Sequence, residues 1–115
     1  MRFLAGASER WAERYERSVY TSTATVRMTE SALRMMAFVF PPEMSRTARE
    51  LAGQPDEDGW LITTVPIESI KQGHIELLKL GDEAEVLAPA ELRDRFAATA
   101  RGLAATYLAA LAETS

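Results

Sequence analysis

Few side chains in this sequence could carry out catalysis or bind a metal. The sequence has one histidine, His74, and no cysteine, which excludes a thiolate nucleophile, a disulfide and a multi-histidine metal centre. His74 lies on the apolar face of a predicted helix, with Ile70 and Leu78 one turn away on either side. This placement is typical of a packed histidine rather than of a general base or a ligand.

The other candidate motifs also argue against an enzyme. Asp56, Glu57 and Asp58 crowd one turn, but a calcium loop needs ligands at alternating positions and a distal glutamate. The glycines do not form a phosphate-binding loop, and no serine lies in a nucleophile elbow. We therefore expect no catalytic residue, no metal site and no cofactor.

Two arginines are the candidates for ligand binding. Arg27 lies in the middle of a predicted strand, and Arg93 lies near the start of the last predicted helix. One interpretation is that these arginines only form salt bridges with nearby acids. The alternative is an anion site, in which Arg27 and Arg93 receive a phosphate or a nucleotide at a domain interface, because guanidinium groups suit such anions.

The composition indicates one acidic domain. The 115 residues are 47% hydrophobic and 26% charged, with a net charge of −4 and a pI near 5.0. A domain that binds nucleic acid by charge needs clustered Lys and Arg, so this balance argues against that class. The sequence has neither a signal-peptide core nor a membrane-spanning run, and we expect a cytoplasmic protein with no membrane contact.

The N-terminal segment from Ser8 to Tyr20 is predicted to be an amphipathic helix. Trp11, Tyr15 and Val19 recur every four residues and form one apolar stripe. The stripe either packs on the core of this chain or contacts a partner chain or a neighbouring domain.

The rest of the sequence indicates alternating strands and helices. Strands are predicted at 24–28, 60–65 and 85–87, and helices at 30–39, 67–80 and from 89 onward. Gly81 is expected to end the second of these helices, and Pro89 lies in the first turn of the last one. The last helix has the clearest periodicity, through Leu92, Phe96, Ala100, Leu103, Tyr107 and Leu111.

Residues 44–52 fit both a helix and a strand. Met44, Ala48 and Leu51 have helical spacing, whereas the turn at 55–59 most simply joins two antiparallel strands. The turn favours a strand over 46–52. The predicted fold is then α+β: a ferredoxin-like βαββαβ sandwich with an N-terminal amphipathic helix and a long C-terminal helix.

Several short motifs, taken in order, resemble the C-terminal extension of bacterial WYL-domain transcriptional regulators, known as the WCX domain. The resemblance covers about residues 23–108. The matching segments are Ala24–Leu33, Asp58-Gly59-Trp60, Leu80-Gly81, Glu85–Pro89, Glu91-Leu92-Arg93 and Tyr107.

This resemblance implies a regulatory and oligomerisation domain with a ferredoxin-like fold. Residues 1–22 would be a linker helix from a preceding WYL domain, and 23–115 the WCX-like domain. The implied partners are a second copy of the chain, contacted through Trp11, Tyr15, Val19 or an exposed strand edge, and DNA, bound only through a helix-turn-helix absent from this sequence. The alternative function is a module for an anionic effector, such as a nucleotide or short single-stranded nucleic acid.

Overall fold

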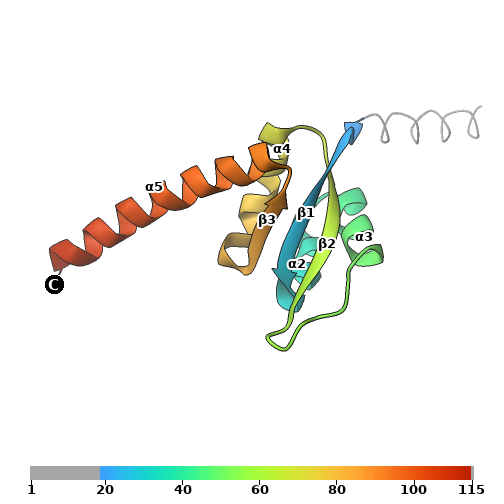
Figure 1. The fold of residues 1–115 in the computed structure, drawn as a ribbon, viewed down its shortest axis with the longest axis horizontal. Coiled ribbons are helices and arrows are strands. Elements are labelled where there is room, and N and C mark those ends of the chain that lie inside the picture. Colours follow the sequence, from blue (N-terminus) through green and yellow to red (C-terminus); the bar gives the residue numbers. More distant parts are fainter. Residues whose placement is uncertain (1–18, 115) are drawn as a thin grey trace, which may run out of the picture.

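A three-stranded antiparallel sheet forms the centre of residues 19–114, the part of the chain that this computed structural model describes (Figure 1). The strands lie in the order β2-β1-β3. In chain order the elements are β1 (Ser22–Thr29), α2 (Glu30–Val39), α3 (Pro42–Glu50), β2 (Trp60–Ile67), α4 (Ile70–Leu77), the 3-10 helix η1 (Leu78–Glu83), β3 (Ala84–Ala88) and α5 (Ala90–Thr114). The predicted α+β class is confirmed.

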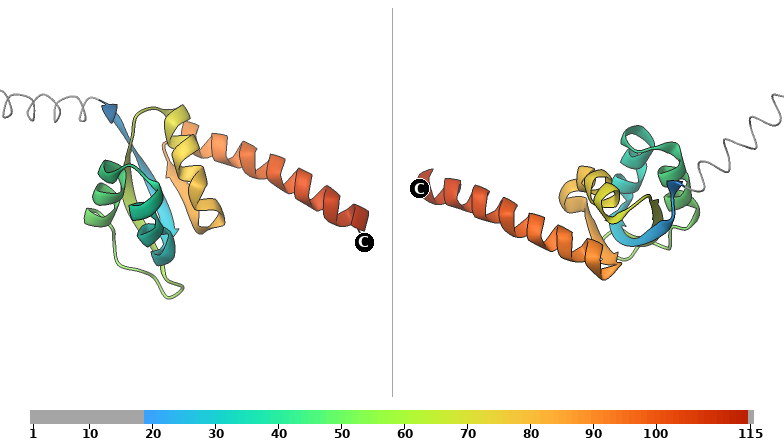
Figure 2. Two further views of the ribbon diagram at one scale, coloured as in Figure 1. Left: turned by 180° about the vertical axis from the view of Figure 1, so that it is seen from behind. Right: turned by 90° about the horizontal axis from the view of Figure 1, so that it is seen from above.

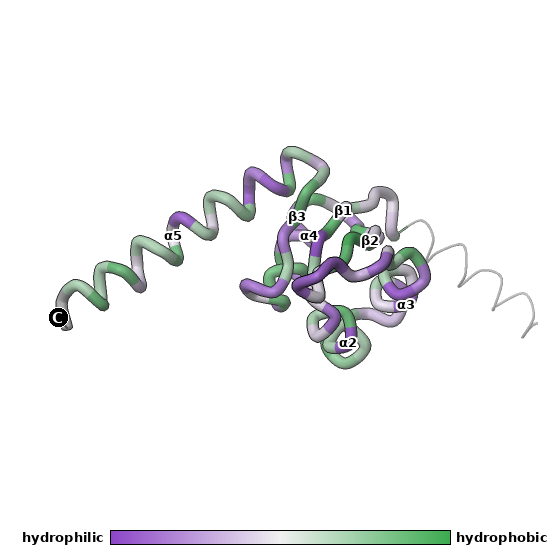
Figure 3. Tube along the Cα trace, turned by 60° about the horizontal axis from the view of Figure 1, so that its bottom comes forward, coloured by the Kyte–Doolittle hydropathy of each residue, from purple (hydrophilic) through white to green (hydrophobic). Residues whose placement is uncertain are grey.

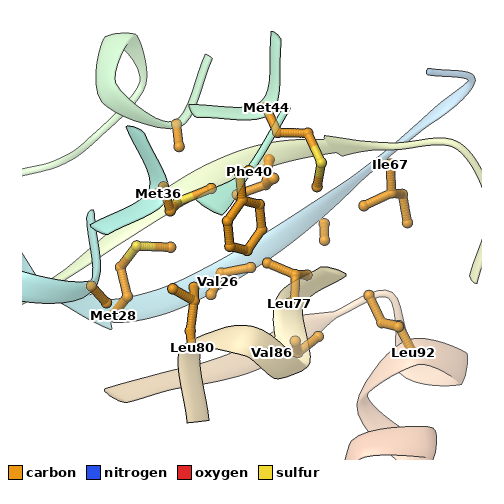
Figure 4. Close-up of a cluster of buried hydrophobic side chains, with 14 of the residues drawn as sticks. Val26, Met28, Met36, Phe40, Met44, Ile67, Leu77, Leu80, Val86 and Leu92 are labelled. Atoms are coloured by element: carbon orange, nitrogen blue, oxygen red, sulfur yellow. The ribbon is translucent and has the colours of Figure 1, made fainter. Parts of the chain in front are cut away.

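The alternating pattern of β1 decides which face of the sheet is buried. Ala24, Val26 and Met28 are fully buried and point to one face, because successive side chains of a strand alternate. Helices α2, α3 and α4 cover that face. Figure 1 shows the sheet from its uncovered side, and the left view of Figure 2 shows the helices in front of it. Figure 4 shows the resulting core, in which side chains from the sheet interlock with those from the helices.

Helix α2 begins where the sequence predicts it. The side-chain oxygen of Thr29 accepts a hydrogen bond from the backbone N–H of Ala32 at 3.0 Å, which satisfies one of the free donors at a helix N-terminus. The Thr29 hydroxyl also donates to Glu83 Oε1 at 2.9 Å. One residue therefore caps α2 and connects it to η1.

The prediction of a strand over 46–52 is wrong, because residues 42–50 form helix α3. The helix buries Met44, Ser45 and Ala48 on one side. In a strand, both faces would carry charged side chains, Arg46 and Glu50 on one face and Arg49 on the other, so neither face would suit the core. Where a fourth strand would lie, the backbone N–H of Gly53 donates to the carbonyl of Ile62 at 2.9 Å. The described residues thus form three strands, and the ferredoxin-like βαββαβ topology is not confirmed.

The helix predicted over 67–80 is shorter than expected. Ile67 is the last residue of β2 and is fully buried, and the helix begins only after Ser69, whose hydroxyl accepts from the N–H of Gln72 at 3.0 Å. After Leu77 the chain continues as the 3-10 helix η1. Gly81 has a positive φ of 60° and interrupts η1, but the helical region ends only at Glu83, so it extends two residues past the predicted terminator.

The long final helix is confirmed as α5, and its two halves have different surroundings. Leu92 is fully buried and Phe96 packs against the core. From Ala100 to Ala112 every residue is exposed. The second half of α5 therefore projects away from the sheet (Figures 1 and 2).

Candidate functional site

No described helix covers the second face of the sheet, and Arg27 lies at its centre. Because Ala24, Val26 and Met28 point into the core, Arg27 points to the opposite face. Its neighbours across the ladder are Ile62 on β2 and Glu85 on β3. The predicted mid-strand position of Arg27 is confirmed.

Arg27 contacts two carboxylates and one aromatic ring. Its Nη1 lies 3.6 Å from Glu85 Oε1 and its Nη2 lies 3.8 Å from Asp56 Oδ2. The guanidinium carbon is 4.4 Å from the centroid of the Trp60 ring, a cation–π distance. Arg27 therefore joins β3, β1 and the turn before β2.

Arg93 reaches the same glutamate from α5. Its Nη1 donates to Glu85 Oε2 at 3.0 Å and to the backbone carbonyl of Val86 at 2.8 Å. Arg27 and Arg93, paired by the sequence analysis, thus meet at one point, and the carboxylate between them belongs to the chain itself. The side chains of these ion pairs are between about a third and a half exposed, so each pair stabilises the fold only modestly.

Three members of this cluster were not predicted from the sequence: Glu85, Asp56 and Trp60. Glu85 lies in the strand that was predicted at 85–87. Nothing local indicates which strands are neighbours, so the pairing of Arg27 with Glu85 becomes visible only in the fold.

Asp56 organises the turn between α3 and β2. Its Oδ1 accepts hydrogen bonds from the backbone N–H groups of Asp58 and Trp60, each at 2.9 Å. The bond from Trp60, followed by the bond from Asp58 and the charge of Arg27, holds the pKa of Asp56 below its ordinary value of 3.8. The turn predicted at 55–59 is confirmed, and it keeps Asp56 ionised beside Arg27.

A groove of about 500 Å³ begins beside Arg93 and Glu85 and runs along the first half of α5. One wall is α5, from Arg93 to Leu103, and the other is formed by η1 and β3. Most of its lining is apolar, through Leu78, Ala84, Val86, Phe96, Ala97, Ala100 and Leu103.

His74 connects α4 to α5 next to this groove. Its Nε2 is hydrogen bonded to Thr99 Oγ1 at 2.9 Å. Its ring packs against the Phe96 ring in a T-shaped arrangement, with the two centroids 4.9 Å apart. His74 is half-buried. These contacts fit the prediction of a packed histidine.

Two of the three residues predicted at an interface, Trp11 and Tyr15, lie outside the described residues. Val19 is described and is half-buried. Within residues 19–114, no group of three or more His, Cys, Asp or Glu side chains could hold a metal ion. The same part of the chain has no helix that is both long and apolar enough to cross a membrane.

The fold and this cluster define a small α+β domain whose central arginines are paired with its own acids beside an apolar groove. The family model of the WCX domain matches residues 20–104, which is most of the chain. The protein therefore belongs to the WCX domain family, as the resemblance indicated. No curated protein matches the sequence.

Proposed function

We propose that this WCX domain is the regulatory and oligomerisation module of a bacterial WYL-type transcriptional regulator, in the cytoplasm. It couples ligand sensing to DNA binding by a helix-turn-helix outside this sequence. The observation that carries the proposal is membership of the WCX family over residues 20–104, since the WCX domain is the C-terminal extension of such regulators.

The charge distribution of the domain supports a role away from DNA. The chain has a net charge of −4, and its central cations, Arg27 and Arg93, are paired with acids. A surface that binds the phosphate backbone needs unpaired cations. In this proposal DNA contact belongs to another domain.

The regulatory role can be tested in the gene that encodes this chain. We expect its coding sequence to contain a helix-turn-helix and a WYL domain, and deletion of codons 23–115 to abolish the response of operator binding to the effector in a gel-shift assay. A coding sequence without a DNA-binding domain, or a deletion that leaves the response intact, would contradict the proposal.

The oligomerisation role predicts that the chain of 115 residues forms a homodimer. Sedimentation equilibrium over a range of concentrations measures this directly, and Trp11→Ala tests whether the stripe of Trp11, Tyr15 and Val19 contributes. A monomer at high concentration, unchanged by Trp11→Ala, would contradict the dimer.

A second candidate function, binding of an anionic effector, is favoured by the convergence of Arg27 and Arg93 on Glu85. A phosphate that displaced the Glu85 carboxylate would meet both guanidinium groups, as in other arginine-based anion sites. Calorimetry at low salt with nucleotides and short oligonucleotides tests this: Glu85→Gln should strengthen binding and Arg93→Ala should weaken it. Absence of heat with both the wild type and Glu85→Gln would exclude such a site in this chain.

A further inference from the structure

The exposed half of α5 has an unusual composition for a helix in water. Between Gly102 and Ala112 it has no charged residue, whereas the preceding half contains Glu91, Arg93, Asp94, Arg95 and Arg101. Figure 3 shows the change, from hydrophilic segments near the sheet to apolar and neutral ones toward the C-terminus. An apolar helix is normally buried against another element.

The large apolar side chains of this half are exposed. The exposed fraction is 50% for Leu103, 66% for Tyr107 and 62% for Leu108. These residues continue the face of α5 that lines the groove, because Phe96, Ala100, Leu103 and Tyr107 follow one another at spacings of three and four. One continuous apolar stripe therefore faces the groove in the first half of α5 and water in the second.

The groove and the exposed half match in length. The groove follows α5 from Arg93 to Leu103, about 16 Å at 1.5 Å per residue, and the uncharged stretch from Gly102 to Ala112 has the same length. If two α5 helices lay antiparallel and crossed near Leu103, the exposed half of each would lie along the groove of the other. This arrangement is symmetric, as expected of an isologous dimer.

We propose that the occupant of the groove is the second half of α5 from a second copy of this chain, so that the two copies exchange their helices. The inference rests on the homodimer proposed above and names a contact surface on it other than the stripe of Trp11, Tyr15 and Val19. Ala100 and Ala104 would lie near the crossing point, where small side chains allow two helices to approach closely.

Charge and area both favour this occupant. Three charged residues line the groove: Glu85 and Arg93 neutralise each other at 3.0 Å, and the third, Asp82, is exposed to water. The rest of the lining is mostly apolar, so the groove suits an uncharged helix better than a charged ligand. About 16 Å of helix with a diameter of about 10 Å has a lateral surface of about 500 Å². Burial of half of it on each copy, with an equal area of groove, gives about 1,000 Å², the lower limit for a specific interface.

Sedimentation equilibrium of the whole chain with a matched pair of variants tests the surface. Tyr107→Glu places a charge on the stripe, whereas Ala109→Glu places the same charge on the opposite side of the same helix. Both positions are exposed, so both variants should fold, as circular dichroism will verify. Tyr107→Glu should raise the dimer dissociation constant about tenfold or more, and Ala109→Glu about twofold or less.

Cysteine cross-linking tests the antiparallel exchange, because the chain contains no natural cysteine. A mixture of chains carrying Ala97→Cys in the groove wall and Tyr107→Cys on the exposed half, treated with a short bifunctional maleimide, should give mainly the mixed cross-linked dimer. Ala109→Cys replaces Tyr107→Cys as the control and should give little of it.

The possible outcomes separate this inference from the proposed function. A dimer that forms without the mixed cross-link, or that Tyr107→Glu and Ala109→Glu affect equally, overturns the helix exchange and leaves the oligomerisation role intact. Cross-links only between two Tyr107→Cys chains would show that the exposed halves of two α5 helices pair with each other, and would also overturn the helix exchange. A monomer at all concentrations overturns both the exchange and the dimer, while the regulatory role is still decided by the deletion of 23–115.

Discussion

The two halves of α5 form one continuous helix but serve the molecule differently. The first half contributes Leu92 and Phe96 to the core and Arg93 to the cluster around Glu85. The second half exposes Leu103, Tyr107 and Leu108 to water, although its periodicity is the same. The comparison shows that the same apolar periodicity can continue from a buried stretch of helix into an exposed one, so periodicity alone does not say whether the core of the chain covers it.

The largest expected difference between the two halves concerns leucine removal. Leu92→Ala empties a fully buried site and should lower the free energy of unfolding by about 2–5 kcal/mol. Leu108→Ala, on the exposed half, should change it by no more than about 0.5 kcal/mol. Urea unfolding at low protein concentration measures both, and similar losses would show that the second half also packs within one chain.

Two helical glycines offer a second comparison. A Cβ at Gly73 in α4 would lie 3.0 Å from Ile67 Cγ2 and 3.2 Å from Ile67 Cβ, so Gly73→Ala should destabilise the fold by about 1–3 kcal/mol through overpacking. A Cβ at Gly102 in α5 meets nothing within 4 Å. Gly102→Ala should therefore stabilise the protein by about 0.5–1 kcal/mol. Thermal unfolding should show opposite shifts in Tm for the two variants. A lower Tm for Gly102→Ala would contradict the open space around Gly102.

The cluster at the start of α5 should contribute less than the core. Glu85→Gln removes the charge that Arg27 and Arg93 share, and because these side chains are partly exposed the loss should be about 0.2–1 kcal/mol. Glu57→Gln, at an exposed position of the turn, controls for the loss of one negative charge. A loss of stability at Glu85 equal to that at Leu92 would contradict this and mean that the cluster holds α5 in place as strongly as the core does.

The smallest expected effect is a pH dependence at Asp56. Its pKa in the folded protein is below the ordinary value of 3.8, so ionised Asp56 stabilises the fold above that pH, and this contribution is lost as the pH falls through the lower, folded-state pKa. Asp56→Asn should thus be less stable than the wild type at neutral pH and equal to it in strong acid. Asp58→Asn is the control in the same turn, and a difference that persists in acid would assign the effect to the turn bonds rather than to the charge.

Much of the fold could be predicted from local patterns. Four features depend on residues close together in the sequence: the alternation of Ala24, Val26 and Met28, the cap at Thr29, the turn at 55–59 and the stripe of α5. Steric and hydrogen-bonding preferences of neighbouring residues determine such features. The segment 44–52 was ambiguous because its local spacing suits a helix while the following turn suits a hairpin.

The sequence by itself thus determined the α+β class, the packed histidine and the family. Tertiary structure alone decided that residues 42–50 form a helix, that Arg27 and Arg93 share Glu85, and that a groove opens beside Phe96. These features depend on contacts between residues distant along the chain, as in the bond from Thr29 to Glu83. Such contacts form only when packing of the whole core selects which elements are neighbours.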